Sequence, residues 1–327
     1  MNERWESTPQ GRALVTGATG LVGRALLRAL AGNVIATTRR APRKAGHLDG
    51  ASDLVTWDTV STLPSNALAG VDAIFHLAGE PVAEGRWTEA KRERIRASRI
   101  DSTRALVHSI EKVDASARPR VFVCASAVGI YGSRGDEVLD EDAAPAEGFL
   151  ADVCREWEAE AARAESLGVR VVSLRIGIVL AKDGGALAKM LTPFKLGLGA
   201  ALGNSAQWMP WIHVDDVVGL LRFAAATGTL RGPVNAVAPA GVTNAEFTRA
   251  LGRAVHRPTL LRAPRFALEL ALGELASVVL ASQRVVPKRA LDAGFEFAHP
   301  TLDEALVATL EGKPSGASSR ERPARDR

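Results

Sequence analysis

The chain has 327 residues, of which 46% are hydrophobic and 24% are charged, a composition typical of a globular protein. Its net charge is +4, but residues 312–327 hold five cations and two acids, so the rest of the chain is nearly neutral and offers no basic face for nucleic acid. Two cysteines, Cys124 and Cys154, are too few for a disulfide framework or a cysteine-rich zinc site. We expect no bound metal.

Targeting and membrane signals are missing from the sequence. Residues 1–10 lack the apolar core of a signal peptide. The most apolar stretch, 266–281, is interrupted by Glu269 and Glu274 and is shorter than the ~18 residues of a membrane span. We therefore expect a cytoplasmic protein without membrane contacts. Its last residues, 312–327, are rich in Ser, Pro, Gly and Arg and are expected to be disordered.

Strand-like and helix-like segments alternate through the first half of the chain. Short apolar runs predict strands at 13–16, 33–38, 53–57, 73–77, 120–125 and 169–174. Helical patterns lie between them at 21–30, 88–110 and 151–166, the last ended by Gly168. This alternation predicts an α/β fold of the Rossmann type, a doubly wound parallel sheet with helices on both faces.

The sequence changes character after residue 180. Glycine-rich stretches at 183–185 and 197–203 are typical of loops, 210–218 and 232–239 look like short returning segments, and helices are expected at 244–255 and 266–281. We predict a nucleotide-binding domain over 11–181, to which later segments return. A smaller substrate lobe is expected over 182–310.

A glycine-rich loop follows the first strand and opens the first helix. Gly17 allows a sharp turn, Gly20 lets a pyrophosphate approach the backbone, and Gly23 lets the helix pack close to the sheet. The helix N-terminus then offers free N–H groups to the phosphates. The residues expected to contact the cofactor here are Gly17, Thr19, Gly20, Leu21, Val22 and Gly23.

The end of the second strand indicates which cofactor is bound. A free 2′-hydroxyl usually meets an acid about 20 residues after the glycines. Here the strand ends in Thr38, Arg39 and Arg40 without an acid, and a guanidinium suits a 2′-phosphate. The pattern favours NADP(H) over NAD; the alternative is a pair of solvated arginines.

Two further strand ends are candidates for cofactor contacts. Asp58 follows the third strand and either accepts from the adenine amino group or serves as a turn residue. After the fourth strand, small residues allow the backbone to approach the cofactor ribose, namely Leu77, Ala78 and Gly79. His76, just before them, is expected to be a packed strand residue.

Several motifs occur in the order in which the extended short-chain dehydrogenase/reductase superfamily has them. The chain resembles this superfamily of sugar-nucleotide epimerases and dehydratases at 16–23, 76–79, 126–132, 174–177 and 211–216. A narrower resemblance is to its atypical "epimerase family" group, on Glu80, Arg86-Trp87, Ser98-Arg99, 193–199, 244–247 and 287–289. That group carries a C-terminal domain of unknown function, here at about 257–305. The resemblance covers roughly 12–310.

One departure from the superfamily concerns its acid/base pair. The family pattern is Tyr-x-x-x-Lys, in which the lysine lowers the tyrosine pKa for proton transfer. The matching positions here are Leu150 and Cys154, and no lysine lies between Lys112 and Lys182. The only tyrosine is Tyr131. The standard pair is therefore absent.

Other residues are candidates for the missing chemistry. Ser126 matches the superfamily hydroxyl that binds the substrate oxygen, or it caps a turn. Tyr131 either acts as a proton donor or only packs. For Cys154, the sequence favours a small buried residue over a reactive thiolate. His213 is either a proton donor or a structural residue that bonds to the neighbouring Asp215 or Asp216.

The resemblance also implies contacts for other side chains. In the group, the stretch holding Arg94 and Arg99 borders the cofactor, so both are expected to contact it. Val179 is placed to offer its backbone to the nicotinamide amide. Loops at strand carboxyl ends line ligand crevices in such sheets, so the substrate candidates are Glu80, Arg86, Trp87 and His213.

Two functions remain open from the sequence. The first is an NADP(H)-dependent oxidoreductase, or an enzyme like the nucleotide-sugar epimerases, acting on a small polar substrate. The second is a non-catalytic NADP(H)-binding regulatory or redox-sensing protein, which the loss of the Tyr/Lys pair favours. Superfamily relatives often form dimers through helices matching 88–110 and 151–166, so the resemblance makes a homodimer one option.

Overall fold

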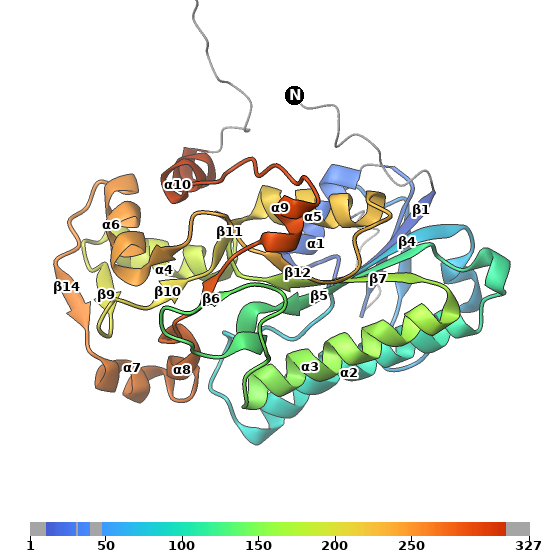
Figure 1. Ribbon diagram of the computed structural model, residues 1–327, viewed down its shortest axis with the longest axis horizontal. Helices are drawn as coiled ribbons and strands as arrows, with labels where there is room; N and C mark the ends of the chain where they lie inside the picture. Colours follow the sequence, from blue (N-terminus) through green and yellow to red (C-terminus); the bar gives the residue numbers. More distant parts are fainter. Residues whose placement is uncertain (1–10, 31, 40–47, 312–327) are drawn as a thin grey trace, which may run out of the picture.

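The computed structural model describes residues 11–30, 32–39 and 48–311, and its centre is a seven-stranded sheet (Figure 1). The strand order is β12-β7-β5-β4-β1-β2-β3, and all six pairings are parallel. These strands are β1 (Arg12–Thr16), β2 (Val34–Thr38), β3 (Asp53–Thr56), β4 (Val71–His76), β5 (Val121–Ala127), β7 (Arg170–Ile176) and β12 (Gly232–Ala236). The predicted α/β Rossmann-type fold is confirmed.

Helices cover both faces of the sheet because alternate strand residues point to opposite sides. On one face, Phe75 packs with leucines of α1 and α5; on the other, Ile74 packs with α2 and α3. Figure 1 shows α2 and α3 lying side by side below the sheet. The four helices are α1 (Leu21–Leu30), α2 (Glu89–Glu111), α3 (Phe149–Ala162) and α5 (Val214–Ala226).

The rest of the chain forms short strand pairs, short helices and turns. The pairs are β8 (Ile178–Leu180) with β11 (Trp211–His213), β9 (Ala200–Leu202) with β14 (Leu261–Ala263), β10 (Trp208–Met209) with β13 (Val242–Thr243), and β6 (Val138–Leu139) with β15 (Arg284–Val285). The helices are α4 (Gly185–Lys195), α6 (Asn244–Ala254), α7 (Arg265–Leu272), α8 (Leu275–Val279), α9 (Lys288–Asp292) and α10 (Leu302–Glu311). The 3₁₀ turns are η2 (Ser65–Leu68), η3 (Ala115–Ala117), η4 (Val128–Tyr131) and η5 (Arg163–Leu167). Of these elements, β8, β11, α4, α6 and α10 share a third apolar cluster.

The sequence-based assignment was wrong in three places after residue 180. The helix α4 was not predicted, because its glycine start and its internal Pro193 hide the helical pattern; burial of Leu187 and Phe194 stabilises it. The helix α5 lies partly in a stretch expected to be a short returning segment. The helix expected over 266–281 is split at Gly273, whose φ is +60°.

Two other features bear on the expectations from sequence. Residues beyond 181 reach the central sheet, because β12 pairs with β7. Among the helices that the structure describes, none combines the length and the apolar character needed to cross a membrane. The expected disordered segment at 312–327 lies outside the described residues.

His76 is fully buried at the end of β4 and connects three elements. Its Nδ1 lies 2.7 Å from Thr16 Oγ1 on β1, and its Nε2 lies 3.2 Å from Ser102 Oγ on α2. Both partners are hydroxyls, so no carboxylate stabilises a charged ring. Burial therefore lowers the pKa of His76 from 6.5 to about 3.

This burial predicts a pH dependence of stability. The unfolded chain takes up a proton at His76 near pH 6.5, whereas the folded chain does so only near pH 3, so the free energy of unfolding falls as the pH drops through this window. We expect the decline between pH 6.5 and 5 to be shallower in His76→Gln, by about 1 kcal/mol per pH unit. Urea unfolding of both proteins between pH 6.5 and 5 measures how the free energy of unfolding changes with pH.

The exposed His256 provides the control for this measurement. His256→Gln should keep the slope of the native protein. Equal slopes for all three proteins would show that His76 does not resist protonation in the folded state.

Candidate functional site

The glycine-rich loop joins β1 to α1 and lies against the end of β4. Gly17 has a φ of +66°, and a Cβ there would lie 2.4 Å from the carbonyl oxygen of Leu77. A Cβ on Gly23 would lie 2.2 Å from the carbonyl oxygen of Gly17. Only glycine fits at these two positions, because backbone atoms already occupy the space.

Gly20 differs from these two glycines. Among the described residues, and apart from its chain neighbours, a Cβ at this position would have one atom within 4 Å, Gly17 O at 3.1 Å. Both Gly20 and Thr19 are exposed. The loop therefore has room on its outer side, beside the N-terminus of α1. Leu21 and Val22 are half-buried in the first turn of that helix, where N–H groups point towards an approaching anion.

The ends of β2 and β3 hold the next candidates. Thr38 is half-buried and Arg39 is exposed directly after β2, while Arg40 lies outside the described residues. The Asp58 carboxylate accepts hydrogen bonds from the backbone of Val60 and Ser61 and from the Ser61 hydroxyl, and these bonds lower its pKa. This geometry favours the turn-residue interpretation of Asp58 over an adenine contact.

The end of β4 is fixed against β1 by a hydroxyl. Thr16 Oγ1 accepts hydrogen bonds from the backbone N–H groups of Leu77 and Ala78, at 3.2 and 3.3 Å. Because Leu77 also contacts Gly17, the segment from Leu77 to Gly79 runs beside the glycine loop. The structure thus brings these two groups of predicted cofactor contacts together at the carboxyl edge of the sheet.

A charged cluster follows this segment. Lys91 Nζ lies 2.8 Å from Glu80 Oε1, and Lys91 is 5% exposed. The backbone N–H of Glu80 donates to Ser98 Oγ, and Arg94 Nε lies 3.6 Å from the same carboxylate oxygen. The hydrogen bond from Lys91 lowers the Glu80 pKa, so the carboxylate is charged at neutral pH.

Arg99 lies between the end of β4 and α3. Its guanidinium donates to the carbonyl oxygens of Glu80 and Ile95 and sits 5.2 Å from the ring centroid of Trp157. A Cβ on Gly79 would come within 3.3 Å of it. Burial lowers the Arg99 pKa, an effect that Cys154 and Glu80 oppose. A fixed cation therefore stands near Cys154, the position that matches the superfamily lysine.

Ser126 and Tyr131 belong to a buried network centred on Arg175. The Ser126 hydroxyl donates to Glu158 Oε1 at 2.6 Å, and Arg175 holds both oxygens of Glu158 at 2.9 Å. Arg175 also donates to Tyr131 Oη at 2.8 Å, which in turn donates to Asn235.

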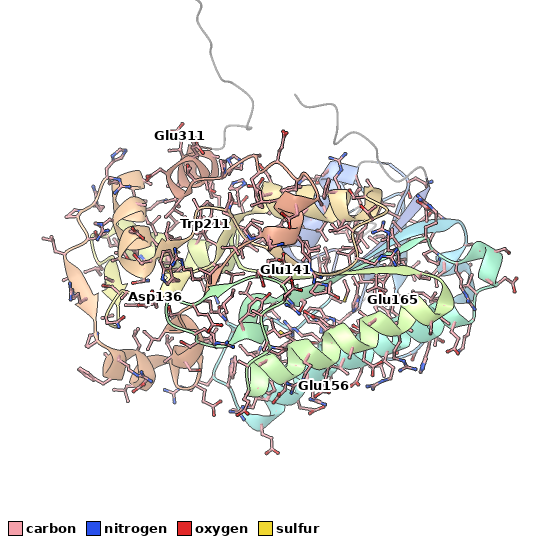
Figure 2. The ribbon with its side chains drawn as sticks, in the orientation of Figure 1. Asp136, Glu141, Glu156, Glu165, Trp211 and Glu311 are labelled. Atoms are coloured by element: carbon pink, nitrogen blue, oxygen red, sulfur yellow. The ribbon has the colours of Figure 1, made fainter. Side chains whose placement is uncertain are left out.

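Glu141 closes this network near the middle of the molecule (Figure 2). Its carboxylate accepts from the backbone N–H groups of Asn235 and Arg289, and burial raises its pKa. Burial also works against the charge of Arg175, but the hydrogen bonds and the charge of Glu158 outweigh this and raise its pKa. Every charged group in the network thus has a partner.

The network encloses the side chains considered for proton transfer. Tyr131 is fully buried and burial raises its pKa, while Ser126 is 3% exposed. Burial raises the Cys154 pKa to about 11, which fits the small buried residue expected from sequence. This geometry favours structural roles for all three.

Two charged residues of the site were missed in the sequence. Lys91 lies in the first turn of α2, after the N-cap Thr88, where the sequence predicts a solvent-exposed lysine. In the structure the pairing with Glu80 buries it. Glu158 lies on the same face of α3 as Leu150 and Cys154, four residues further along. That spacing was a usable signal.

The other substrate candidates are more dispersed. Arg86 is exposed. Trp87 packs edge-to-face on Phe149, and its ring N–H donates a hydrogen bond to the carbonyl oxygen of Val82. Val179 is half-buried in β8. His213 caps α5 and contacts His299, so it lies in a separate cluster from Glu80 and Lys91.

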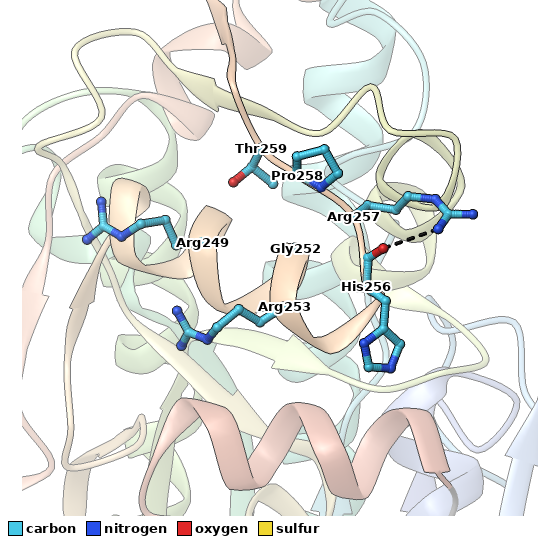
Figure 3. A pocket seen from close by; sticks show the side chains of 7 residues that line it. All are labelled: Arg249, Gly252, Arg253, His256, Arg257, Pro258 and Thr259. Carbon is cyan, nitrogen blue, oxygen red and sulfur yellow. Dashed lines mark hydrogen bonds between the residues drawn. The ribbon is translucent and has the colours of Figure 1, made fainter.

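An open depression of about 680 Å³ lies beside the C-terminal end of α6 (Figure 3). It is lined by Arg249, Gly252, Arg253, His256, Arg257, Pro258 and Thr259. Two of these arginines already have partners, since Arg253 pairs with Asp303 and Arg257 donates to the carbonyl oxygens of Lys195 and His256. Figure 1 places α6 at the opposite end of the molecule from β1, so this depression is not the nucleotide crevice.

Comparisons with known proteins agree with these features. The model of the NAD dependent epimerase/dehydratase family matches residues 13–236, and a domain of unknown function (DUF1731) matches 263–309. An epimerase family protein of Mycobacterium bovis is 42% identical over 297 residues, which cover 89% of this chain and 95% of that protein. The chloroplastic SDR39U1 homolog of Arabidopsis thaliana is 41% identical over 300 residues, covering 91% and 86%.

A solved structure is similar over its whole length. The crystal structure of human epimerase family protein SDR39U1 (isoform 2) with NADPH has a TM-score of 0.80 and 32% identity, and the match covers 92% of this chain and 100% of that chain. The resemblance expected from the motifs is confirmed. The chain belongs to the NAD dependent epimerase/dehydratase family, in the group of epimerase family proteins with a C-terminal domain of unknown function.

Proposed function

We propose that the chain binds NADP(H) along the carboxyl edge of its sheet and uses it to act on a small polar substrate, as an oxidoreductase or an enzyme like the nucleotide-sugar epimerases. The observation that carries this proposal is the glycine loop. Backbone atoms occupy the space that a side chain would need at Gly17 and Gly23. Gly20, in contrast, is exposed beside a helix N-terminus. That is the arrangement a pyrophosphate requires, and the human relative was crystallised with NADPH.

The preference for the phosphorylated cofactor rests on Arg39. It is exposed directly after β2, the strand end at which the adenine ribose is bound in this fold. A planar, permanently charged guanidinium suits a 2′-phosphate.

The chain's own residues supply binding and charge, and a bound nicotinamide would supply hydride transfer. Arg99 places a positive charge beside Gly79 and Cys154, where the superfamily has its lysine. Lys91 holds one oxygen of Glu80, and the Glu80 side chain remains 20% exposed, so solvent reaches it. We propose that the Lys91 ammonium donates a proton to the substrate oxygen as hydride reaches the carbonyl carbon, and that solvent then returns the proton to Lys91. The charged Glu80 carboxylate holds Lys91 in position for this transfer.

A second candidate is binding of NADP(H) without turnover. Leu150 and Cys154 occupy the acid/base positions, and the hydroxyls of Ser126 and Tyr131 are enclosed by Glu158, Arg175 and Asn235. This enclosure favours a redox-sensing or regulatory protein. Tight NADPH binding with no turnover on a broad panel of carbonyl substrates would support it.

The first prediction concerns cofactor choice. Arg39→Ala should weaken NADPH at least tenfold, about 1.4 kcal/mol, while NADH changes little, because only NADPH carries the 2′-phosphate. Calorimetric titration with each cofactor measures both affinities. Arg265→Ala removes an exposed arginine of α7 and is the matched control. An equal loss for both cofactors would contradict the assignment of Arg39.

The second prediction concerns the loop. Gly20→Val should abolish binding of NADPH and NADH with little change in thermal stability, because its side chain enters the space left for phosphate rather than the protein core. Gly228→Val is the control, since a Cβ there meets nothing within 4 Å. Binding that survives in Gly20→Val would show that the pyrophosphate lies elsewhere.

The third prediction concerns turnover. With a carbonyl substrate that supports NADPH oxidation, Glu80→Gln should reduce kcat at least tenfold and leave NADPH affinity within about threefold, because Lys91 loses the carboxylate that positions it for proton transfer. Ser126→Ala is the comparison. A larger fall in Ser126→Ala than in Glu80→Gln would return the chemistry to the Ser126 hydroxyl expected from sequence.

A further inference from the structure

Two histidines and an aspartate meet at the start of α5, outside the proposed cofactor site. His213 ends β11 and caps α5, Asp215 lies in the first turn of that helix, and His299 comes from the segment before α10. The two imidazole rings have centroids 4.0 Å apart and planes inclined by 54°. Asp215 Oδ2 lies 3.6 Å from His213 Nδ1 and 3.7 Å from His299 Nε2.

One nitrogen of this cluster, His299 Nε2, lacks a hydrogen-bond partner among the described residues. His299 is 4% exposed, and this nitrogen is itself buried. A buried polar nitrogen in this condition is rare in native proteins and needs a cause. This nitrogen lies beside the Asp215 carboxylate, and one potential ligand atom from each of the three residues falls within 4.8 Å of the others.

We propose that His213, Asp215 and His299 form a binding site for a divalent transition-metal cation of the zinc, cobalt or nickel class. Bonds of about 2.0–2.1 Å to a tetrahedral ion place neighbouring ligand atoms about 3.3 Å apart. The two separations from Asp215, 3.6 and 3.7 Å, come close to this. All three ligand atoms lie within 4.8 Å of one another, so small movements of the side chains would complete the geometry. Two imidazoles and one carboxylate suit these ions, whereas Mg²⁺ and Ca²⁺ prefer oxygen ligands.

The local chemistry supports an open site. The Asp215 side chain is 60% exposed, which leaves a route from solvent and room for a water ligand. Binding replaces one existing hydrogen bond, from the Asp215 N–H to His213 Nδ1 at 3.2 Å.

The position of the site indicates a structural effect. Asp216, next to Asp215, already accepts hydrogen bonds from the backbone N–H groups of Ala298 and His299. A cation bound to both histidines would strengthen the same junction between α5 and the segment that leads to α10. The absence of metal expected from cysteine counting does not extend to this site, because none of its ligands is a cysteine.

The test uses the full chain without a polyhistidine tag, freed of metal with a chelator. Titration with Zn²⁺ against a chromophoric chelator, and with Co²⁺ followed by its visible absorption, should show one cation per chain. Millimolar Mg²⁺ should not compete. Asp215→Asn should weaken binding at least tenfold, while the stability of the metal-free protein stays near that of the native chain because this side chain is exposed.

Two further variants complete the experiment. His256→Ala removes an exposed histidine outside the cluster and should leave the affinity unchanged. His299→Gln should abolish the Co²⁺ absorption. Because His299 is buried and its replacement can impair folding, Asp215→Asn decides the outcome. No cation bound to the native chain, or equal affinity in the native chain and in Asp215→Asn, would overturn the proposal.

Discussion

The close approach of β1 and β4 at their carboxyl ends is the constraint on which the site depends. Gly17 turns directly against Leu77, and Thr16 holds the backbone of Leu77 and Ala78 through a single hydroxyl. His76 extends the same junction to α2. Because these contacts leave no space for a side chain, they fix the glycine loop, the end of β4 and the start of the charged cluster relative to one another.

A second constraint is the ion pair of Arg175 and Glu158 inside the protein. Charges taken out of water are tolerated only with full hydrogen bonding, and here every oxygen and nitrogen that the pair presents to the core has a partner. The pair uses the Ser126 hydroxyl and the Tyr131 phenol as such partners. These two hydroxyls are thereby held in the interior, whereas the Glu80 side chain remains 20% exposed.

The parts that the sequence predicted well are set by local rules. The six strands of the first half and the loop around Gly20 follow from short apolar runs and from glycine positions, which neighbouring residues determine. The helix α4 depends on burial of Leu187 and Phe194 against other segments. The split at Gly273 follows from a φ of +60°, which glycine readily adopts. Burial of Lys91 and the meeting of His213 with His299 depend on contacts between residues 11 and 86 positions apart, so no pattern within one window identifies them. The place of Glu158 on one helix face with Leu150 and Cys154 was visible in the sequence, but its pairing with Arg175 was not.

The C-terminal segment has a consequence for how the protein can be divided. The strand β15 pairs with β6, Gln283 donates to the carbonyl of Val128, and Asn235 donates to that of Val286. The region matched by the domain of unknown function also contributes Ala290 and Phe295 to the apolar cluster beside the central sheet. The two family regions are separate in sequence but share one interior. A cut between them would leave β12 and the Arg175 network open to water, so the boundary between the two family regions does not separate two folding units.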